Sequence, residues 1–159
     1  MLKAFGAFRD QGRVENIYEE MKEKHVAFNE ITLGCLIDAL IKNNKLDKAF
    51  EIVEKENEPP LTTIMYTMLI KGFSKEKKLA KALDLVESMK QTAEAKPNIV
   101  TYNSLMDCAV SCREFTILEK IYKELTANKE GIDGVIPDLI THSTYIKGLC
   151  KARQSLKAF

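Results

Sequence analysis

The chain has 159 residues, of which 24 are Lys or Arg and 23 are Asp or Glu, and 45% are apolar. This length and apolar content fit a folded domain with its own core and exclude intrinsic disorder, while 4 Cys and 7 Gly are too few for a small disulfide-stapled scaffold. No window approaches the roughly eighteen uncharged apolar residues of a transmembrane helix, and a formal net charge of +1 argues against a strongly basic nucleic-acid-binding module.

Apolar residues recur at helical spacing in four segments along the chain. In order, these segments are residues 14–21, 46–53, 79–89 and 115–125. Each forms an apolar stripe about 100° wide, which is typical of a helix buried on one side. No segment combines strict apolar–polar alternation with a hairpin turn, so strands are not expected. The predicted fold class is all-α.

A second sequence motif precedes three of these helical segments and recurs once more near the C-terminus. It occupies residues 31–40, 64–73, 100–109 and 140–149, with its first residues spaced 33, 36 and 40 apart. Residues 1–6 align with 69–74, and this alignment continues without a gap to Met21 against Met89. A period of this length, with two helices in each unit, predicts a solenoid of stacked helical hairpins.

The repeats predict one continuous array over residues 1–159 rather than separate domains. Complete units are expected at 30–62, 63–98 and 99–138, with partial units at 1–29 and 139–159. The first partial unit is expected to begin inside its first helix, and the last to stop inside its second helix. The chain is therefore expected to be a segment of a longer array, so the lack of a targeting peptide says nothing about its compartment.

The units resemble the pentatricopeptide repeat family over essentially the whole chain. The resemblance is carried by the run Val100-Thr-Tyr-Asn-Ser-Leu-Met, the Glu-rich endings at 19–22 and 87–90, and the pairs Pro97-Asn98 and Pro137-Asp138. The tetratricopeptide repeat has a similar period but favours a Trp in its first helix, and this chain contains no Trp. The resemblance implies a right-handed superhelical solenoid of antiparallel helical hairpins.

The resemblance also implies that the chain binds single-stranded RNA, with about one base recognised per repeat. In this family an apolar residue at the start of each motif sandwiches the base, and here these residues are Ile31, Ile64, Val100 and Ile140. The first base-recognition position lies three residues later, at Gly34, Thr67, Asn103 and Ser143. The second lies just before the next first helix, at Asn29, Thr62, Asn98 and Asp138.

The family's pairing rule implies a base for two of these pairs. Thr67 with Asn98 would recognise adenine, and Asn103 with Asp138 would recognise uracil, so adjacent A and U would be preferred. The pair of Gly34 and Thr62 departs from the family pattern, because Gly has no side chain that donates or accepts a hydrogen bond. The partners of Asn29 and Ser143 would lie outside this sequence.

A structural role competes with each of these assignments. Ser, Thr, Asn and Asp are favoured at helix starts, and Thr101 and Thr141 are predicted to be helix caps. For Thr67, Asn98, Asn103 and Asp138 the repeat alignment favours recognition over capping. The four apolar sandwich residues could equally form part of the core between repeats.

Lysines on the predicted first helices are candidates for contacts with the RNA backbone. Lys42, Lys75 and Lys151 share one position in the repeat, and Lys71 and Lys147 share another. Such rows would contact phosphates and make affinity depend on salt, although solubility alone also favours exposed Lys. Asp38 and Asp107 interrupt the second row, so uneven phosphate contact is expected. The charge of +1 is then an average over unlike surfaces, and it does not exclude RNA.

The sequence shows no arrangement typical of catalysis or metal binding. Cys108 and Cys112 could place two thiols on one helix face, but a zinc site needs two further ligands nearby. Neither His has a nucleophile partner, and no Gly-rich phosphate loop occurs. We therefore predict a binding module rather than an enzyme, with no catalytic residues, metal, cofactor, small-molecule substrate or membrane contact.

The leading functional prediction is sequence-selective binding of single-stranded RNA in organellar RNA processing, stability or translation. The family resemblance implies a location in the mitochondrion or plastid. Two alternatives remain open: an architectural subunit of an organellar ribosome or other ribonucleoprotein, which would contact ribosomal RNA and protein partners, and a helical scaffold that binds a protein.

Overall fold

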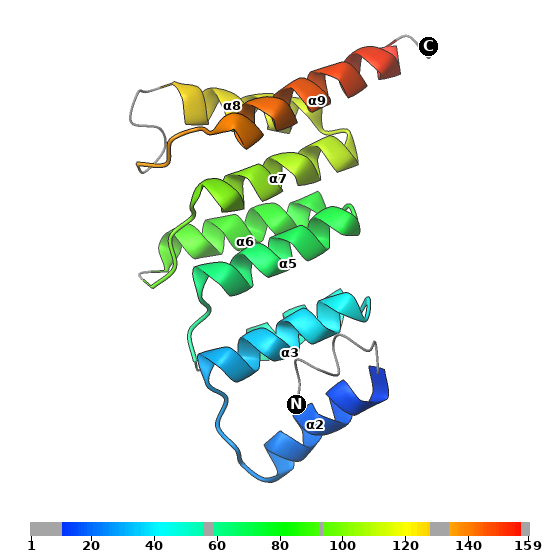
Figure 1. The fold of residues 1–159 in the computed structure, drawn as a ribbon, viewed down its shortest axis with the longest axis vertical. Coiled ribbons are helices and arrows are strands. Elements are labelled where there is room, and N and C mark those ends of the chain that lie inside the picture. The colour runs from blue at the N-terminus through cyan, green and yellow to red at the C-terminus, as the bar shows by residue number, and fades with distance from the viewer. Residues whose placement is uncertain (1–10, 56–58, 93, 128–133, 157–159) are drawn as a thin grey trace.

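A computed structural model describes residues 11–55, 59–92, 94–127 and 134–156. Within these ranges the chain forms α-helices and no strand, and the helices are stacked along one long axis (Figure 1). The helices are α2 (Gln11–Glu23), α3 (Glu30–Lys42), α4 (Leu46–Lys55), α5 (Thr63–Lys75), α6 (Leu79–Gln91), α7 (Ile99–Cys112), α8 (Phe115–Thr126) and α9 (Leu139–Leu156). A search of these residues for a helix of sufficient length and apolarity to span a bilayer finds none.

The helices form two layers. The first helices of the units, α3, α5, α7 and α9, each contact the next one along the stack. The second helices α4, α6 and α8 each contact the first helix of their own unit and that of the following unit. This arrangement confirms the predicted all-α solenoid of helical hairpins.

The N-terminal partial unit confirms the gapless alignment of its sequence with the unit at 63–98. Helices α2 and α6 occupy equivalent residues in that alignment, with the same start and the same end. Its expected first-helix residues lie within 1–10, outside the described ranges. The repeat pattern therefore located this helix even though the unit is incomplete.

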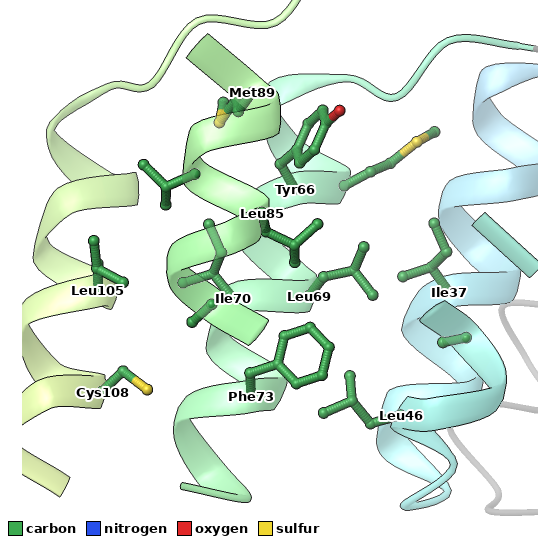
Figure 2. Close-up of a cluster of buried hydrophobic side chains, with 14 of the residues drawn as sticks. Ile37, Leu46, Tyr66, Leu69, Ile70, Phe73, Leu85, Met89, Leu105 and Cys108 are labelled. Carbon is green, nitrogen blue, oxygen red and sulfur yellow. The ribbon is translucent and has the colours of Figure 1, made fainter. Parts of the chain in front are cut away.

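The core runs through the stack because each first helix buries side chains in two directions. On α5, Leu69, Ile70 and Phe73 are fully buried. Figure 2 shows this helix between α3 and α4, which contribute Ile37 and Leu46, and α7, which contributes Leu105 and Cys108. Burial on both sides explains why the first helices are more uniformly apolar than the amphipathic second helices.

A small residue recurs where a first helix crosses the second helix of the preceding unit. A Cβ atom added to Gly72 would come within 2.6 Å of Leu46 Cδ1, and one added to Gly148 would overlap Leu118 Cδ2. Leu46 and Leu118 are both buried second-helix residues. The close approach thus joins neighbouring units rather than the two helices of one hairpin.

The turns between first and second helices share a left-handed residue. Asn44, Lys77 and Arg113 have φ values of 59°, 57° and 63° and stand at the same position in successive units. Arg153 is the equivalent residue in the last unit, and it lies within the continuous helix α9. The prediction that the last unit enters its second helix is therefore wrong. Residues 150–156 contain no helix-breaking Gly or Pro. The described residues also contain no later helix whose packing against α9 would stabilise a turn at Arg153.

Candidate nucleic-acid interface

The four apolar residues that begin the motifs are exposed. Their exposed fractions are 77% for Ile31, 72% for Ile64, 45% for Val100 and 59% for Ile140. The alternative that they form core between repeats is therefore wrong. Each lies in the first turn of a first helix, so the stacking of these helices repeats them along one side of the layer. Large apolar side chains repeated in this way favour a surface that a ligand covers.

A groove of about 460 Å³ lies between α5, α7 and α9. It brings together six residues predicted from the repeat register, namely Lys71, Lys75, Val100, Asn103, Asp138 and Ile140. It is also lined by four residues that were not predicted: Ser74, Ser104, Asp107 and Thr144. We call the side of the first helices that carries this groove and the exposed apolar residues the groove face.

The second recognition positions are all helix caps. The side chains of Asn29, Thr62, Asn98 and Asp138 each accept a hydrogen bond from the backbone N–H three residues later, over 2.8 to 3.4 Å. Thr101 and Thr141 form reciprocal hydrogen bonds, in which their hydroxyls accept from the backbone N–H of Asn98 and Asp138. The predicted caps at Thr101 and Thr141 are confirmed as parts of capping boxes. Capping and base recognition need not compete, since a cap uses one side-chain oxygen.

Asn103 and Asp138, which lie near the two ends of one unit, contact each other. Asn103 Nδ2 donates to Asp138 Oδ1 over 3.0 Å, and Asn103 Oδ1 accepts from the Thr141 hydroxyl over 2.7 Å. The backbone N–H of Thr141 also donates to Asp138 Oδ1, over 2.8 Å. Side-chain contacts do not occupy one N–H of the Asn103 amide or the Oδ2 atom of Asp138, while the backbone N–H of Ile140 also donates to the Asp138 carboxylate.

The hydrogen bonds to Asp138 also fix its charge. The backbone N–H of Thr141, followed by the side chain of Asn103, lowers the pKa of the Asp138 carboxyl below its ordinary value. Hydrogen bonds of this kind favour the ionised form because a carboxylate accepts them more strongly than the acid does. At neutral pH Asp138 is therefore ionised, and its carboxylate accepts hydrogen bonds but cannot donate one.

Thr67 and Asn98 are connected through Thr101 in a parallel arrangement. The Thr67 hydroxyl donates to the carbonyl oxygen of Thr63 over 2.8 Å and lies 3.4 Å from the Thr101 hydroxyl. Asn98 Oδ1 accepts from both the backbone N–H and the hydroxyl of Thr101, over 3.0 and 3.1 Å. This leaves the Thr67 oxygen as an acceptor and the Asn98 Nδ2 group as a donor for a ligand.

The pair of Gly34 and Thr62 lacks such a connection. Met65 occupies the position that Thr101 and Thr141 fill in the later units, and it is buried. A Cβ atom added to Gly34 would lie 3.5 Å from Met65 Cε, so the sulfur side chain covers the space next to the Gly. An apolar contact replaces the polar network at this interface.

The two unpaired recognition residues have local roles. Asn29 accepts hydrogen bonds from the backbone and the hydroxyl of Thr32, both over 2.8 Å. Ser143 is exposed and donates to the carbonyl oxygen of Ile140 over 3.0 Å. Neither has a hydrogen bond to another recognition residue within the described part of the chain.

The candidate backbone lysines fall into two groups. Lys42 pairs with Asp38 over 2.7 Å, and Lys147 pairs with Asp107 over 2.9 Å. Within the described residues, no ion pair is formed by Lys71, Lys75 or Lys151. The two acidic residues that interrupt the second lysine row therefore neutralise one lysine in each row, which provides a structural basis for uneven phosphate contact.

Cys108 belongs to the core rather than to the groove. Burial, followed by the proximity of Cys112, raises the pKa of its thiol to about 12. A thiol with this pKa is protonated at neutral pH and is a weak metal ligand. In the residues that the structure describes, no group of three or more His, Cys, Asp and Glu side chains could hold a metal ion.

Three features of the site escaped the sequence analysis. Thr101 and Thr141 were assigned only as caps, although the Thr141 hydroxyl also donates to Asn103, and the Thr101 hydroxyl lies 3.4 Å from that of Thr67, in the preceding repeats. Met65 was overlooked because an apolar residue in an apolar helix carries no signal by itself. At this repeat position the residue is Thr where the first recognition residue of the preceding unit is Asn or Thr, and it is Met where that recognition residue is Gly. This correlation could have revealed the roles of the threonines and of Met65.

Comparison with known proteins identifies this repeat pattern. A model described as "PPR repeat family" matches residues 61–111, and one described as "PPR repeat" matches 31–55 and 100–129. A chloroplastic pentatricopeptide repeat-containing protein of Arabidopsis thaliana is 21% identical over 151 residues, which cover 94% of this chain and 19% of the relative. Protein LOW PHOTOSYNTHETIC EFFICIENCY 1, a chloroplastic protein of the same plant, is 28% identical over 117 residues, covering 70% of this chain and 16% of the relative. The chain spans about a fifth of the length of the curated relatives it matches.

Solved structures show the same architecture. The pentatricopeptide repeat protein PPR10 from maize superposes with a TM-score of 0.77 at 20% identity, over 97% of this chain and 22% of that protein. PPR10 in complex with an 18-nt psaJ RNA element superposes with a TM-score of 0.72 at 26% identity, over 95% and 21%.

Proposed function

Because this chain belongs to the pentatricopeptide repeat family, we propose that it binds single-stranded RNA along the groove face. The observation that carries the proposal is the position of exposed apolar residues next to pairs of polar side chains whose free donors and acceptors are fixed by hydrogen bonds. The similar fold of PPR10, which was solved in complex with an RNA element, supports RNA as the ligand.

The exposed apolar residues suit the flat faces of unpaired bases. Val100 and Ile140 both line the groove, on consecutive first helices, and Asn103 and Asp138 belong to the same lining. A base placed there would bury apolar surface on both faces while its edge meets polar groups. Single-stranded RNA offers such bases, whereas a duplex hides both the faces and the Watson–Crick edges.

The pair of Asn103 and Asp138 offers a donor and an acceptor to the base edge. The remaining Asn103 N–H is a donor, and Asp138 Oδ2 is an acceptor. Uracil and guanine have the complementary pattern, a carbonyl oxygen beside a ring N–H. The family resemblance favours uracil among these two.

The pair of Thr67 and Asn98 offers the reverse pattern. The Thr67 oxygen is an acceptor because its hydrogen is donated to Thr63, and Asn98 Nδ2 is a donor. Adenine and cytosine match this pattern, since each has an amino group beside a ring nitrogen that accepts. The family resemblance favours adenine, so the chain would prefer adjacent A and U.

The biological setting follows from the relatives. Several of them are named chloroplastic, which supports a plastid rather than a mitochondrial location for the protein. Binding of this kind would act by occupancy, in the processing, stability or translation of an organellar transcript. The groove face is proposed to serve RNA binding and not catalysis.

Base preference is the direct test of this function. We expect a short RNA containing one adjacent A and U in otherwise uniform cytosine to bind about tenfold more tightly than one in which U is replaced by C, because a good recognition pair discriminates by about 1–3 kcal/mol. Equilibrium binding by fluorescence anisotropy, with each of the two positions varied through all four bases, measures this. Equal binding of every sequence would instead support an architectural role in a ribonucleoprotein, with contacts to ribosomal RNA and neighbouring proteins. No binding at low salt would support a protein-binding scaffold.

The salt dependence should identify the lysines that contact phosphate. Replacing Lys75 by Gln is expected to reduce the slope of log affinity against log salt by about 0.7, the value for one phosphate contact on a single strand. Lys42→Gln is the matched control, because Lys42 occupies the equivalent repeat position but pairs with Asp38. Binding titrations at several salt concentrations measure both slopes. An equal loss from both variants would contradict the assignment.

A further inference from the structure

Buried threonines connect the recognition pairs to the backbone of the next first helix. Thr101 and Thr141 lie in the first turns of α7 and α9, and both are fully buried. A capping box needs the Thr hydroxyl only as an acceptor for the cap residue's backbone N–H. Both hydroxyls reach further: Thr141 donates to Asn103 Oδ1 on α7, and Thr101 lies 3.4 Å from the Thr67 hydroxyl on α5.

We propose that Thr101 and Thr141 are specificity-determining positioning residues, whose hydroxyls set which hydrogen-bonding groups each recognition pair presents to its RNA base. This inference rests on the proposed function, because it concerns how the same groove face discriminates between bases. It assigns a recognition role to residues that do not themselves line the groove.

The orientation of the Asn103 amide shows how a hydroxyl can act in this way. An amide can rotate by half a turn and exchange its oxygen and nitrogen, which exchanges a donor for an acceptor toward the base. The Thr141 hydroxyl has a single hydrogen, and of its two acceptors Asn103 Oδ1, at 2.7 Å, is nearer than Asp138 Oδ1, at 2.9 Å. Asp138 Oδ1 also accepts from Asn103 Nδ2, over 3.0 Å. Both bonds of the Asn103 amide demand the same orientation, with an N–H toward the groove. Without the hydroxyl, Oδ1 loses its donor at a largely buried site, and the amide gains by turning or withdrawing from Asp138.

Thr101 acts on the other residue of its pair. Asn98 Oδ1 accepts from the Thr101 backbone and hydroxyl, so the Nδ2 group is left as the donor. The two threonines therefore hold the recognition pairs in opposite patterns. The donor is the first residue, Asn103, in one pair, and the second residue, Asn98, in the other.

The chain contains a natural counterexample at the Gly34 interface. Met65 stands at the position of Thr101 and Thr141, and the recognition residue it faces is a Gly. Thr32 also stands at this position, and among the described residues its hydroxyl bonds to its own cap residue, Asn29. A buried Thr close to the preceding unit thus occurs where the first recognition residue of that unit has a polar side chain. Met takes the place of this Thr where the recognition residue is Gly.

Two matched Val substitutions test the inference in the 159-residue chain. Thr141→Val and Thr101→Val each remove one buried hydroxyl and one capping-box acceptor, so we expect them to lower the thermal stability by similar amounts. Thr141→Val should reduce the preference for U over C from about tenfold to about twofold, with the preference for A at the neighbouring position unchanged. Thr101→Val should reduce the preference for A and leave the preference for U unchanged. Thr141→Ser keeps the hydroxyl and should keep the preference for U.

The results separate this inference from the proposed function. If Thr141→Val retains the full preference for U, or weakens binding of all sequences equally, the threonine is a structural cap only and the inference is wrong. If the unsubstituted chain itself shows no base preference, the proposed base recognition fails, and the inference fails with it. Melting curves recorded by circular dichroism for each variant show that the compared chains are folded.

Discussion

Replacing Phe73 by Ala is expected to lower the free energy of unfolding by about 3–5 kcal/mol, the range for truncating a buried aromatic side chain. Phe73 is fully buried, and its ring contacts that of Phe50 edge to face, with the centroids 5.5 Å apart. It lies where α5 meets α4 and α6, near Leu46 and Leu69 (Figure 2). Because a solenoid is stabilised by contacts between neighbouring units, the loss should weaken the coupling of the units on either side. Urea unfolding followed by circular dichroism measures the change.

Ile64→Ala is the control for this substitution. Ile64 is also a large apolar residue of α5, but it is exposed on the groove face. Its removal should change stability by no more than about 0.5 kcal/mol, while weakening RNA binding severalfold. A loss of stability as large as that of Phe73→Ala would show that Ile64 belongs to the core, against the exposure described above.

Installing the missing network at the first recognition pair is expected to create a new base preference. The substitutions are Gly34→Asn, Thr62→Asp and Met65→Thr, which copy Asn103, Asp138 and Thr141. We expect a preference of about tenfold for U over C at one additional position, because the pair would present the same donor and acceptor. The cost should be a loss of about 2 kcal/mol of stability, since Met65 is buried. Binding to RNAs varied at the base next to the A and U pair measures the preference.

The same chain with Met65 retained is the matched comparison. Gly34→Asn with Thr62→Asp supplies both recognition residues but not the hydroxyl, and it places the Asn side chain against Met65. The preference for U should then be about twofold at most. If this double variant discriminates as well as the triple variant, the threonine contributes nothing to specificity, whereas the recognition pair itself remains supported.

Much of the fold followed from the repeat pattern alone. The helical spacing of apolar residues located the second helices, and the gapless alignment of the N-terminal residues with the unit at 63–98 placed α2 at the residues it occupies. The error at the C-terminus, where α9 continues through Arg153, has a physical cause. The turn at Lys77 and Arg113 uses a left-handed conformation that neither residue prefers, so the sequence carries no local signal for it.

The sequence predicted residues of the candidate site but not the hydrogen bonds between them. The register of the repeats brought Val100, Asn103 and Asp138 to one groove, as expected from their equivalent positions. Their roles as helix caps and as recognition residues were treated as competing. In the structure the caps of Asn98 and Asp138 each use one side-chain oxygen, which leaves the Asn98 amide nitrogen and the second Asp138 oxygen outside the cap.

The sequence by itself determined the all-α class, the repeat period and the positions that recur, because periodicity in side-chain character is enough to define a repeating helical unit. Only the tertiary structure decided that the motif-leading Ile and Val residues are exposed, that Asp38 and Asp107 neutralise Lys42 and Lys147, and that buried threonines bond to the preceding repeat. The lysine pairs and the threonine bonds depend on distances of about 3 Å between side chains, and the Lys147 pair and the threonine bonds join residues from different units. Exposure likewise depends on how neighbouring helices pack, and the order of residues along one chain does not specify such contacts.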